Sequence, residues 1–221
     1  MSRRVTRQGI VDLTNNLPYT LCFVNEINSV DLIPTAITYR LISEKVVDKS
    51  LHLKMMTVEI AKKGEEVQEL KFVLLSKGLT SIAIPVKTNG ESTTIIPIGI
   101  DVPKIFCDFP LIGTEAFPFP TIINNPNFNP TDPRDGIFLT DSTRANRLTD
   151  ENKQILEDAV TLYFDLLDYA IKNNWENLHL LAKLGNLREP ILSNTSITWY
   201  ERAIQDPIRK KLESSSIVKN A

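Results

Sequence analysis

Several features that mark common functional classes are scarce or missing in this chain of 221 residues. No apolar run reaches the ~18 residues that a membrane span requires. The opening residues MSRRVTRQGIVDL include basic side chains but lack the apolar core of a secretory signal. The net charge of −2 predicts no electrostatic attraction to nucleic acid or to anionic membranes. We therefore expect a cytoplasmic protein that binds neither.

Residue types that hold metals and phosphates are also few. The two cysteines, Cys22 and Cys107, lie far apart in apolar surroundings, which is typical of thiols in a reducing compartment rather than of a disulfide. The two histidines, His52 and His179, have no cysteine or carboxylate at ligand spacing, so the sequence predicts no metal site. The eight glycines are scattered singly and form no phosphate-binding loop.

Motifs of a self-contained enzyme are missing as well. The sequence contains no GxSxG, HExxH or GxxxxGK[ST]. Paired acids such as Glu157 with Asp158, and Asp165 with Asp168, fall on or beside the polar face of a predicted helix, where solvation explains them. We therefore expect the chain not to be catalytic by itself.

The first two-thirds of the sequence predicts strands. Segments rich in β-branched and aromatic residues, several of them alternating, occupy residues 19–24, 36–47, 51–61, 67–76, 80–86, 93–100, 104–109 and 121–124. The peptide KKGEE and the pair Asn89-Gly90 mark hairpin turns. Pro85 and Pro97 indicate that their strands lie at sheet edges or contain bulges.

The hydrophobic period changes after Thr140. Residues 150–173 place apolar side chains at steps of three and four, which predicts a long amphipathic helix capped by Thr149 or Asp150. A short helix is expected at residues 176–184, and a last one at residues 194–214 bent at Pro207.

Strands followed by helices predict an α+β fold. We expect a mixed, largely antiparallel sheet in the first two-thirds, packed with carboxy-terminal helices. The sheet-rich region would cover residues 1–148 and the helical region residues 149–221, and the two would form one domain.

Residues 105–139, IFCDFPLIGTEAFPFPTIINNPNFNPTDPRDGIFL, hold six of the thirteen prolines and many large apolar rings. Each proline fixes φ and removes a backbone donor, so the second half of this stretch is predicted to form a long ordered surface loop. Such a loop, with Arg134 near its end, is often functional. A stiff connection between the sheet and the helices explains it as well.

This stretch resembles a segment of the sacsin repeats, where a strand ending in Phe-Cys-Phe-Leu-Pro-Leu leads to a strand reading Val-His-Ile-Asn-Gly and an Asn-Arg-Arg cluster. The flanks LPYTLCFVNEINSVDL and ILEDAVTLYFDLLDYAI are also similar, so the resemblance spans residues 17–171. The chain has one arginine where the family has two, and no glycine after Asn124. The matching residues are Phe106, Cys107, Phe109, Pro110, Leu111, Thr114, Pro120, Ile122, Asn124, Phe128 and Arg134.

Sacsin repeats belong with the heat-shock-protein-90-like, or GHKL, ATPases, in which a middle or transducer domain follows an amino-terminal ATP-binding domain. The nucleotide domain's Glu-x-x-x-Asn helix and Asp-x-Gly-x-Gly loop are missing here. The resemblance therefore implies a chaperone middle-domain-like fold and the role of a transducer segment in a larger ATP-dependent, chaperone-type protein.

The resemblance also implies that the chain binds no cofactor alone, because ATP and Mg would be held by a separate nucleotide-binding domain. Arg134 would reach the γ-phosphate of that ATP. Arg144 and Arg147 are weaker candidates for binding phosphate, since surface charges at the start of a helix explain them more simply.

An alternative is an interaction module without a nucleotide role, in which the Pro/Phe-rich stretch binds a partner or client protein. Exposed Phe117 and Phe119 would favour this alternative, whereas buried ones would favour a packing role.

Overall fold

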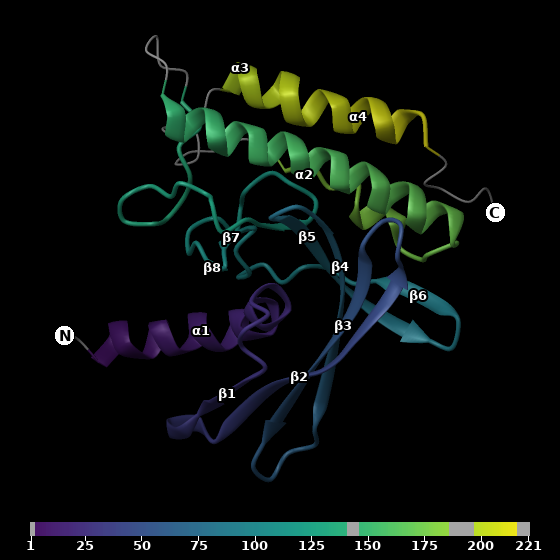
Figure 1. Cartoon of the computed structure of the whole chain (residues 1–221). Helices are drawn as coiled ribbons and strands as arrows, with labels where there is room; N and C mark the ends of the chain where they lie inside the picture. The colour runs from purple at the N-terminus through teal and green to yellow at the C-terminus, as the bar shows by residue number, and fades with distance from the viewer. Residues whose placement is uncertain (1–2, 141–145, 186–196, 216–221) are drawn as a thin grey trace.

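One curled sheet organises the computed structural model, which describes residues 3–140, 146–185 and 197–215 (Figure 1). Within these residues the strands are β1 Ser29–Leu32, β2 Ile37–Asp48, β3 Leu53–Lys62, β4 Gln68–Lys77, β5 Thr80–Asn89, β6 Ser92–Ile95, β7 Ile105–Cys107, β8 Phe109–Pro110 and β9 Ile122–Asn124. The helices are α1 Arg3–Phe23, α2 Arg147–Lys172, α3 Ile197–Tyr200 and α4 Asp206–Glu213. Short 3₁₀ turns occur at η1 Ile33–Thr35 and η2 Leu178–Leu180, and the π-helical turn η4 Glu201–Gln205 joins α3 to α4.

The strands pair in the order β1-β2-β3-β4-β5-β9-β7-β8, and β6 pairs with the end of β5. Every pairing is antiparallel except that of β7 with β9. The prediction of an α+β fold with a mixed, largely antiparallel sheet is therefore confirmed. None of the described helices is long and apolar enough to cross a membrane.

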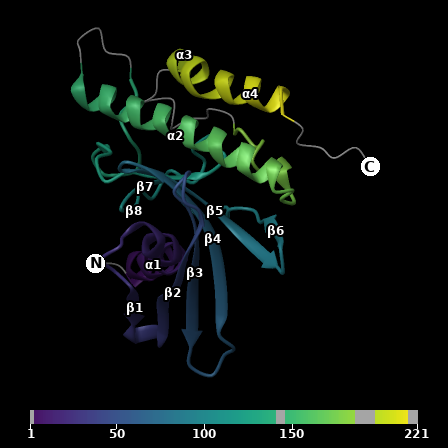
Figure 2. The ribbon, with the colours of Figure 1, turned by 45° about the vertical axis from the view of Figure 1, so that its right-hand side comes forward.

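Alternate side chains of the central strands are buried on opposite faces of the sheet. In β4, Val73 and Leu75 belong to one hydrophobic core, and Phe72 and Leu74 belong to the other. This alternation follows from the strand period of two, and it requires a covering layer on each face. Figures 1 and 2 show α2 over one face with α3 and α4 beside it, and α1 on the opposite side.

Helix α2 packs on the sheet through a wide apolar stripe. Leu156, Tyr163 and Leu166 on this stripe have no exposed surface. The predicted helix is confirmed, but it begins earlier than expected, because Asn146 is its N-cap and its side chain accepts a hydrogen bond from the backbone N–H of Leu148. Thr149 is instead buried inside the first turn.

The strand predicted at residues 19–24 is wrong, because this segment is the last turn of α1. Its aromatic and β-branched composition is typical of strands, but the helix buries Leu17 and Leu21, one turn apart, against the sheet. Tyr19 packs on Phe72 with ring centroids 4.8 Å apart. Tertiary packing thus overrides the local strand propensity.

The other differences concern the ends of elements. The strand predicted at residues 93–100 stops at Ile95, and the helix predicted at residues 176–184 is reduced to the single turn η2. The hairpin at Asn89-Gly90 is present, but Asn89 pairs with Ser92, so the turn consists of Gly90, with φ of 60°, and Glu91.

Pro85 lies inside β5, which is not an edge strand. Its carbonyl accepts a hydrogen bond from the N–H of Ile96, so the side of Pro85 that lacks an N–H faces the region between β9 and β6. No ladder bond is lost there, because β9 pairs only as far as Ala83 and β6 begins to pair at Val86.

We predict that Leu166→Asp unfolds or strongly destabilises the protein. The new carboxylate would enter a fully buried site without a partner, which we expect to lower the free energy of unfolding by about 3 kcal/mol or more. Urea denaturation followed by circular dichroism measures this change. Leu148→Asp, on an exposed position of the same helix, is the matched control, and equal midpoints for the two variants would show that the buried face of α2 is assigned incorrectly.

Candidate functional site

The Pro-rich stretch ends in a loop, residues 125–139, that we call the arginine loop. Its first residue, Asn125, is buried and fixed to the sheet: the side-chain amide donates to Thr80 Oγ1 at 2.9 Å, and the backbone N–H donates to the carbonyl of Phe106 at 3.2 Å. The Asn125 side chain also accepts from the N–H of Asn127 at 2.8 Å, which closes a local turn. The loop therefore leaves the sheet in a defined direction.

Asn152 of α2 holds the middle of the arginine loop. Its Oδ1 accepts from the backbone N–H of Asn129 at 2.8 Å, and its Nδ2 donates to the carbonyls of Asn129 and Phe138 at 2.9 and 3.1 Å. Asn152 is completely buried, so these bonds satisfy an amide that would otherwise be costly inside the core. One side chain thus joins both arms of the loop to the helix.

The tip of the loop is a tight turn closed by Thr131. The N–H of Thr131 donates to the carbonyl of Gly136 at 2.9 Å, and its hydroxyl donates to Asp135 Oδ1 at 2.7 Å. The Arg134 N–H in turn donates to the Thr131 carbonyl at 2.6 Å. Gly113 packs closely against this turn, because a Cβ at Gly113 would come within 2.9 Å of the Asp135 carbonyl oxygen. The backbone at Gly113 therefore supports the tip of the loop.

Arg134 has a backbone conformation that arginine rarely adopts. Its φ is +73°, in the left-handed region, which costs a residue with a Cβ roughly 1 kcal/mol and costs glycine almost nothing. The side chain is exposed, and no hydrogen-bonding or ionic partner for the guanidinium occurs among the described residues. A charged side chain held at such a position is a feature of binding and catalytic loops.

Arg147 lies at the start of α2 and is engaged in an ion pair. Its Nε lies 2.6 Å from Glu151 Oε1, and Glu151 Oε2 accepts a hydrogen bond from Asn129 in the arginine loop. The bonds from Arg147 and Asn129 lower the pKa of Glu151, and the same pair raises the pKa of Arg147. This exposed pair is consistent with a surface charge at the helix start. Arg144, the other weak candidate, lies outside the described residues.

Phe117 and Phe119 are buried, with 5% and 2% of their surface exposed. Phe117 meets Tyr200 of α3 edge-on at 5.6 Å, and Phe119 meets Tyr163 of α2 at 6.2 Å. Both rings thus attach the Pro-rich stretch to the helical layer, which favours a packing role over a partner-binding one.

Asn152 was not identified from the sequence, although a signal for it exists. It precedes Ile155 and Leu156 by three and four residues, so it occupies the apolar stripe of the predicted helix. A polar amide at a core position indicates a buried hydrogen-bonding role. Its partners lie 23 and 14 residues away along the chain, and only the folded structure identifies them.

No protein-family model matches the chain, and no curated protein or solved structure is significantly similar to it. Within the described ranges, no group of three or more His, Cys, Asp or Glu side chains is arranged to hold a metal ion. The arginine loop therefore has to be interpreted from its own geometry.

We predict that Asn152→Asp loosens the arginine loop. The aspartate keeps the acceptor for Asn129 but places a second oxygen against the carbonyls of Asn129 and Phe138. We expect the free energy of unfolding to fall by about 2 kcal/mol. Faster amide hydrogen exchange at Thr131 and Arg134 would report the loss of order in the loop. Asn127→Asp, at an exposed position of the same loop, is the control; identical exchange in both variants would contradict the bracing role.

Proposed function

We propose that this chain is the transducer-like middle segment of a GHKL-type, ATP-dependent protein, and that its arginine loop presents Arg134 to the γ-phosphate of ATP held by a separate nucleotide-binding domain. The observation that supports this proposal is an exposed arginine in a strained backbone conformation, on a loop fixed to the sheet, to α2 and to Gly113. Among the residues that the structure describes, its guanidinium has no partner. The residue resemblance to the sacsin repeats supplies the class of protein.

The chemistry of arginine suits this role. A guanidinium stays charged at all physiological pH values and presents a planar set of donors that matches phosphate oxygens. In other phosphoryl-transfer systems, an arginine supplied by a neighbouring domain increases the rate by ~10³ or more. Because the loop is already ordered, docking it onto a phosphate loses little backbone entropy.

The chain would act only together with a partner domain. The arginine loop would supply a guanidinium, and the sequence lacks the Glu-x-x-x-Asn helix and the Asp-x-Gly-x-Gly loop of the nucleotide domain. Nucleotide binding and the base would come from the other domain. Binding of that domain would complete the site, as substrate-induced closure does in many phosphoryl-transfer enzymes.

We predict that the isolated chain neither binds nor hydrolyses ATP, because the sequence lacks the acidic base and magnesium-binding asparagine of the nucleotide domain. Titration calorimetry with Mg-ATP measures this directly. Micromolar affinity in the isolated chain would refute the assignment to the transducer side of the ATPase.

We predict that Arg134→Gly lowers ATP turnover of the full-length protein at least ten-fold and leaves ATP affinity nearly unchanged. Such a pattern is expected when a contact forms mainly in the transition state. Glycine removes the guanidinium and also relieves the positive φ, so this variant should be at least as stable as the wild type. Steady-state turnover, ATP binding and thermal unfolding are the measurements.

Three further variants serve as controls. Arg134→Ala should reduce turnover to the same extent. Arg134→Lys should have a turnover only slightly higher than that of Arg134→Ala, since an ammonium lacks the planar set of donors of a guanidinium. Arg147→Ala removes an arginine that is already paired and should leave turnover within two-fold. Unchanged turnover in Arg134→Gly would exclude Arg134 from the phosphate contact.

A second candidate function, protein interaction, is favoured by a surface other than the one that the sequence indicated. Ile100 is 87% exposed and Phe109 is 53% exposed, although Phe117 and Phe119 are buried. A hollow beside Ile100 combines apolar and acidic side chains, which would suit a basic, amphipathic partner segment. Ile100→Asp tests this candidate and leaves the arginine loop intact. The hollow is lined by Val11, Asp12, Asn15, Ile100, Asp101, Ile112 and Glu115.

A further inference from the structure

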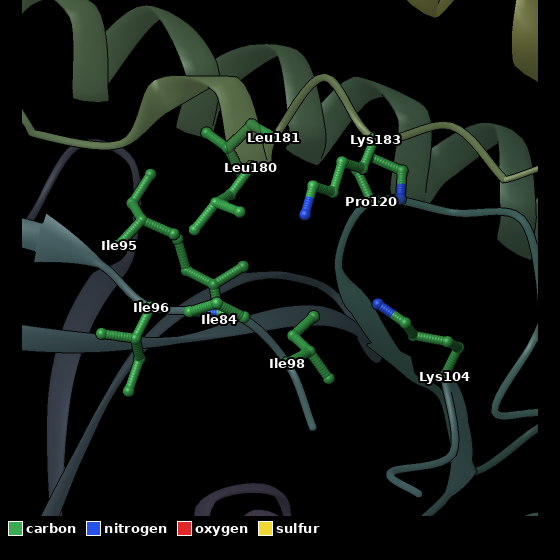
Figure 3. Close-up of a pocket in the computed structure, with 10 residues that line it drawn as sticks. Ile84, Ile95, Ile96, Ile98, Lys104, Pro120, Leu180, Leu181 and Lys183 are labelled. Carbon is green, nitrogen blue, oxygen red and sulfur yellow. The ribbon is translucent and has the colours of Figure 1, made fainter. Parts of the chain in front are cut away.

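A pocket of about 100 Å³ lies between the sheet and the segment that follows α2 (Figure 3). Lys104, immediately before β7, and Lys183, after η2, contribute to its lining. None of the described residues that line it carries a carboxylate. Most of its wall is aliphatic. Ile84 comes from β5, Ile95 and Ile96 from the end of β6 and the residue after it, and Leu180 and Leu181 from the end of η2 and the residue after it.

The pocket walls are held in place by hydrogen bonds. The Asn177 side chain donates to the carbonyl of Ile95 at 3.1 Å, and the N–H of Ile95 donates to the carbonyl of Glu176 at 3.1 Å. The buried hydroxyl of Tyr163 donates to the carbonyl of Leu181 at 2.8 Å. These bonds join η2 to β6 and to α2, so the cavity is already formed without a ligand, as small-molecule sites usually are.

The two lysines place positive charge where the described residues of the pocket wall supply no opposite charge. Lys104 is half-buried, and desolvation lowers its pKa to about 8. Figure 3 shows both side chains directed into the same space. No described acceptor or carboxylate pairs with either amino group. Two ammonium groups facing an apolar cavity are unfavourable on their own, and a bound anion would relieve this cost.

We propose that this pocket binds a small organic carboxylate, with its aliphatic body against the isoleucine and leucine wall and its carboxylate between Lys104 and Lys183. Charge-assisted hydrogen bonds from the two ammonium groups would orient the carboxylate of the ligand, and the apolar wall would select against inorganic anions. This site is separate from the arginine loop and does not depend on the proposed function.

The volume of the pocket limits the size of the ligand. An engineered cavity of ~150 Å³ holds one benzene molecule, so this smaller space accommodates an aliphatic body of about three or four carbons. Isobutyrate therefore serves as the probe, isobutyramide as its neutral equivalent of nearly the same shape, and inorganic phosphate as an anion without an apolar body. For so small a ligand we expect a Kd on the order of 1 mM.

The experiment is a titration of the full chain with each probe, followed by amide chemical shifts in two-dimensional NMR at constant ionic strength. Isobutyrate should shift resonances of Ile84, Ile98 and Leu181 with saturation, and isobutyramide and phosphate should bind at least ten-fold more weakly. Lys104→Met and Lys183→Met should each weaken isobutyrate at least ten-fold. Lys210→Met, at an exposed position of α4, is the control and should have no effect.

The pH dependence provides a second readout that a purely structural role of Lys104 would not give. Lys183 is the other titratable group on the described pocket wall. Because Lys104 must be protonated to bind the anion and its pKa is about 8, affinity should fall about ten-fold between pH 7 and pH 9. The Lys104→Met variant should lose this dependence.

Three results would overturn the proposal. Equal binding of isobutyramide would show a neutral apolar cavity, and equal binding of phosphate would show a lysine pair without selection for an apolar body. Isobutyrate affinity that is unchanged in both lysine variants would place the ligand elsewhere. Because ATP turnover enters none of these measurements, their failure leaves the proposal for Arg134 unaffected.

Discussion

The structure depends on the burial of both faces of the central strands. Alternate residues of β4 and β5 project into separate cores, one under α2 and one against α1, so neither helix is dispensable. The same alternation continues across β9, where Ile123 joins the core under α2 and Ile122 joins the other. Since β9 also pairs with β5 on one side and with β7 on the other, both burial and backbone pairing fix the start of the arginine loop.

Polar contacts determine the conformation of the arginine loop, which hydrophobic burial alone does not determine. Hydrophobic packing is non-directional, so it places the arginine loop near α2 without setting its conformation. Asn152, completely buried, supplies that direction through bonds to backbone groups on both arms of the loop. Buried polar groups impose strict geometry because an unmet donor or acceptor in the core is costly. The loop tip, held by Thr131 and supported by Gly113, adds only local bonds to this frame.

The sequence predicted those elements whose periodicity reflects burial on defined faces. Strands β2 to β5 and helix α2 were recognisable for this reason. Helix α1 was not recognisable from the sequence, because Tyr19 and Cys22 have low helix propensity and lie in the core that contains Phe72. Prolines marked the arginine loop, but its bracing depends on residues far apart in the chain. The pocket lined by Lys104 and Lys183 combines five separate segments of the chain, so no local pattern reveals it.

The two cationic sites differ in a way that follows from the chemistry of their side chains. A guanidinium keeps its charge wherever it lies and therefore suits an exposed position such as Arg134, where the proposed function requires a partner to approach. An ammonium changes its pKa readily on burial, and Lys104 shows this change inside a mostly aliphatic wall. The desolvated charge at Lys104 is unfavourable in the isolated chain, and the proposed anion in the pocket would reduce this cost. The strained backbone at Arg134 would stay strained, and the proposed contact with a phosphate would have to offset its cost.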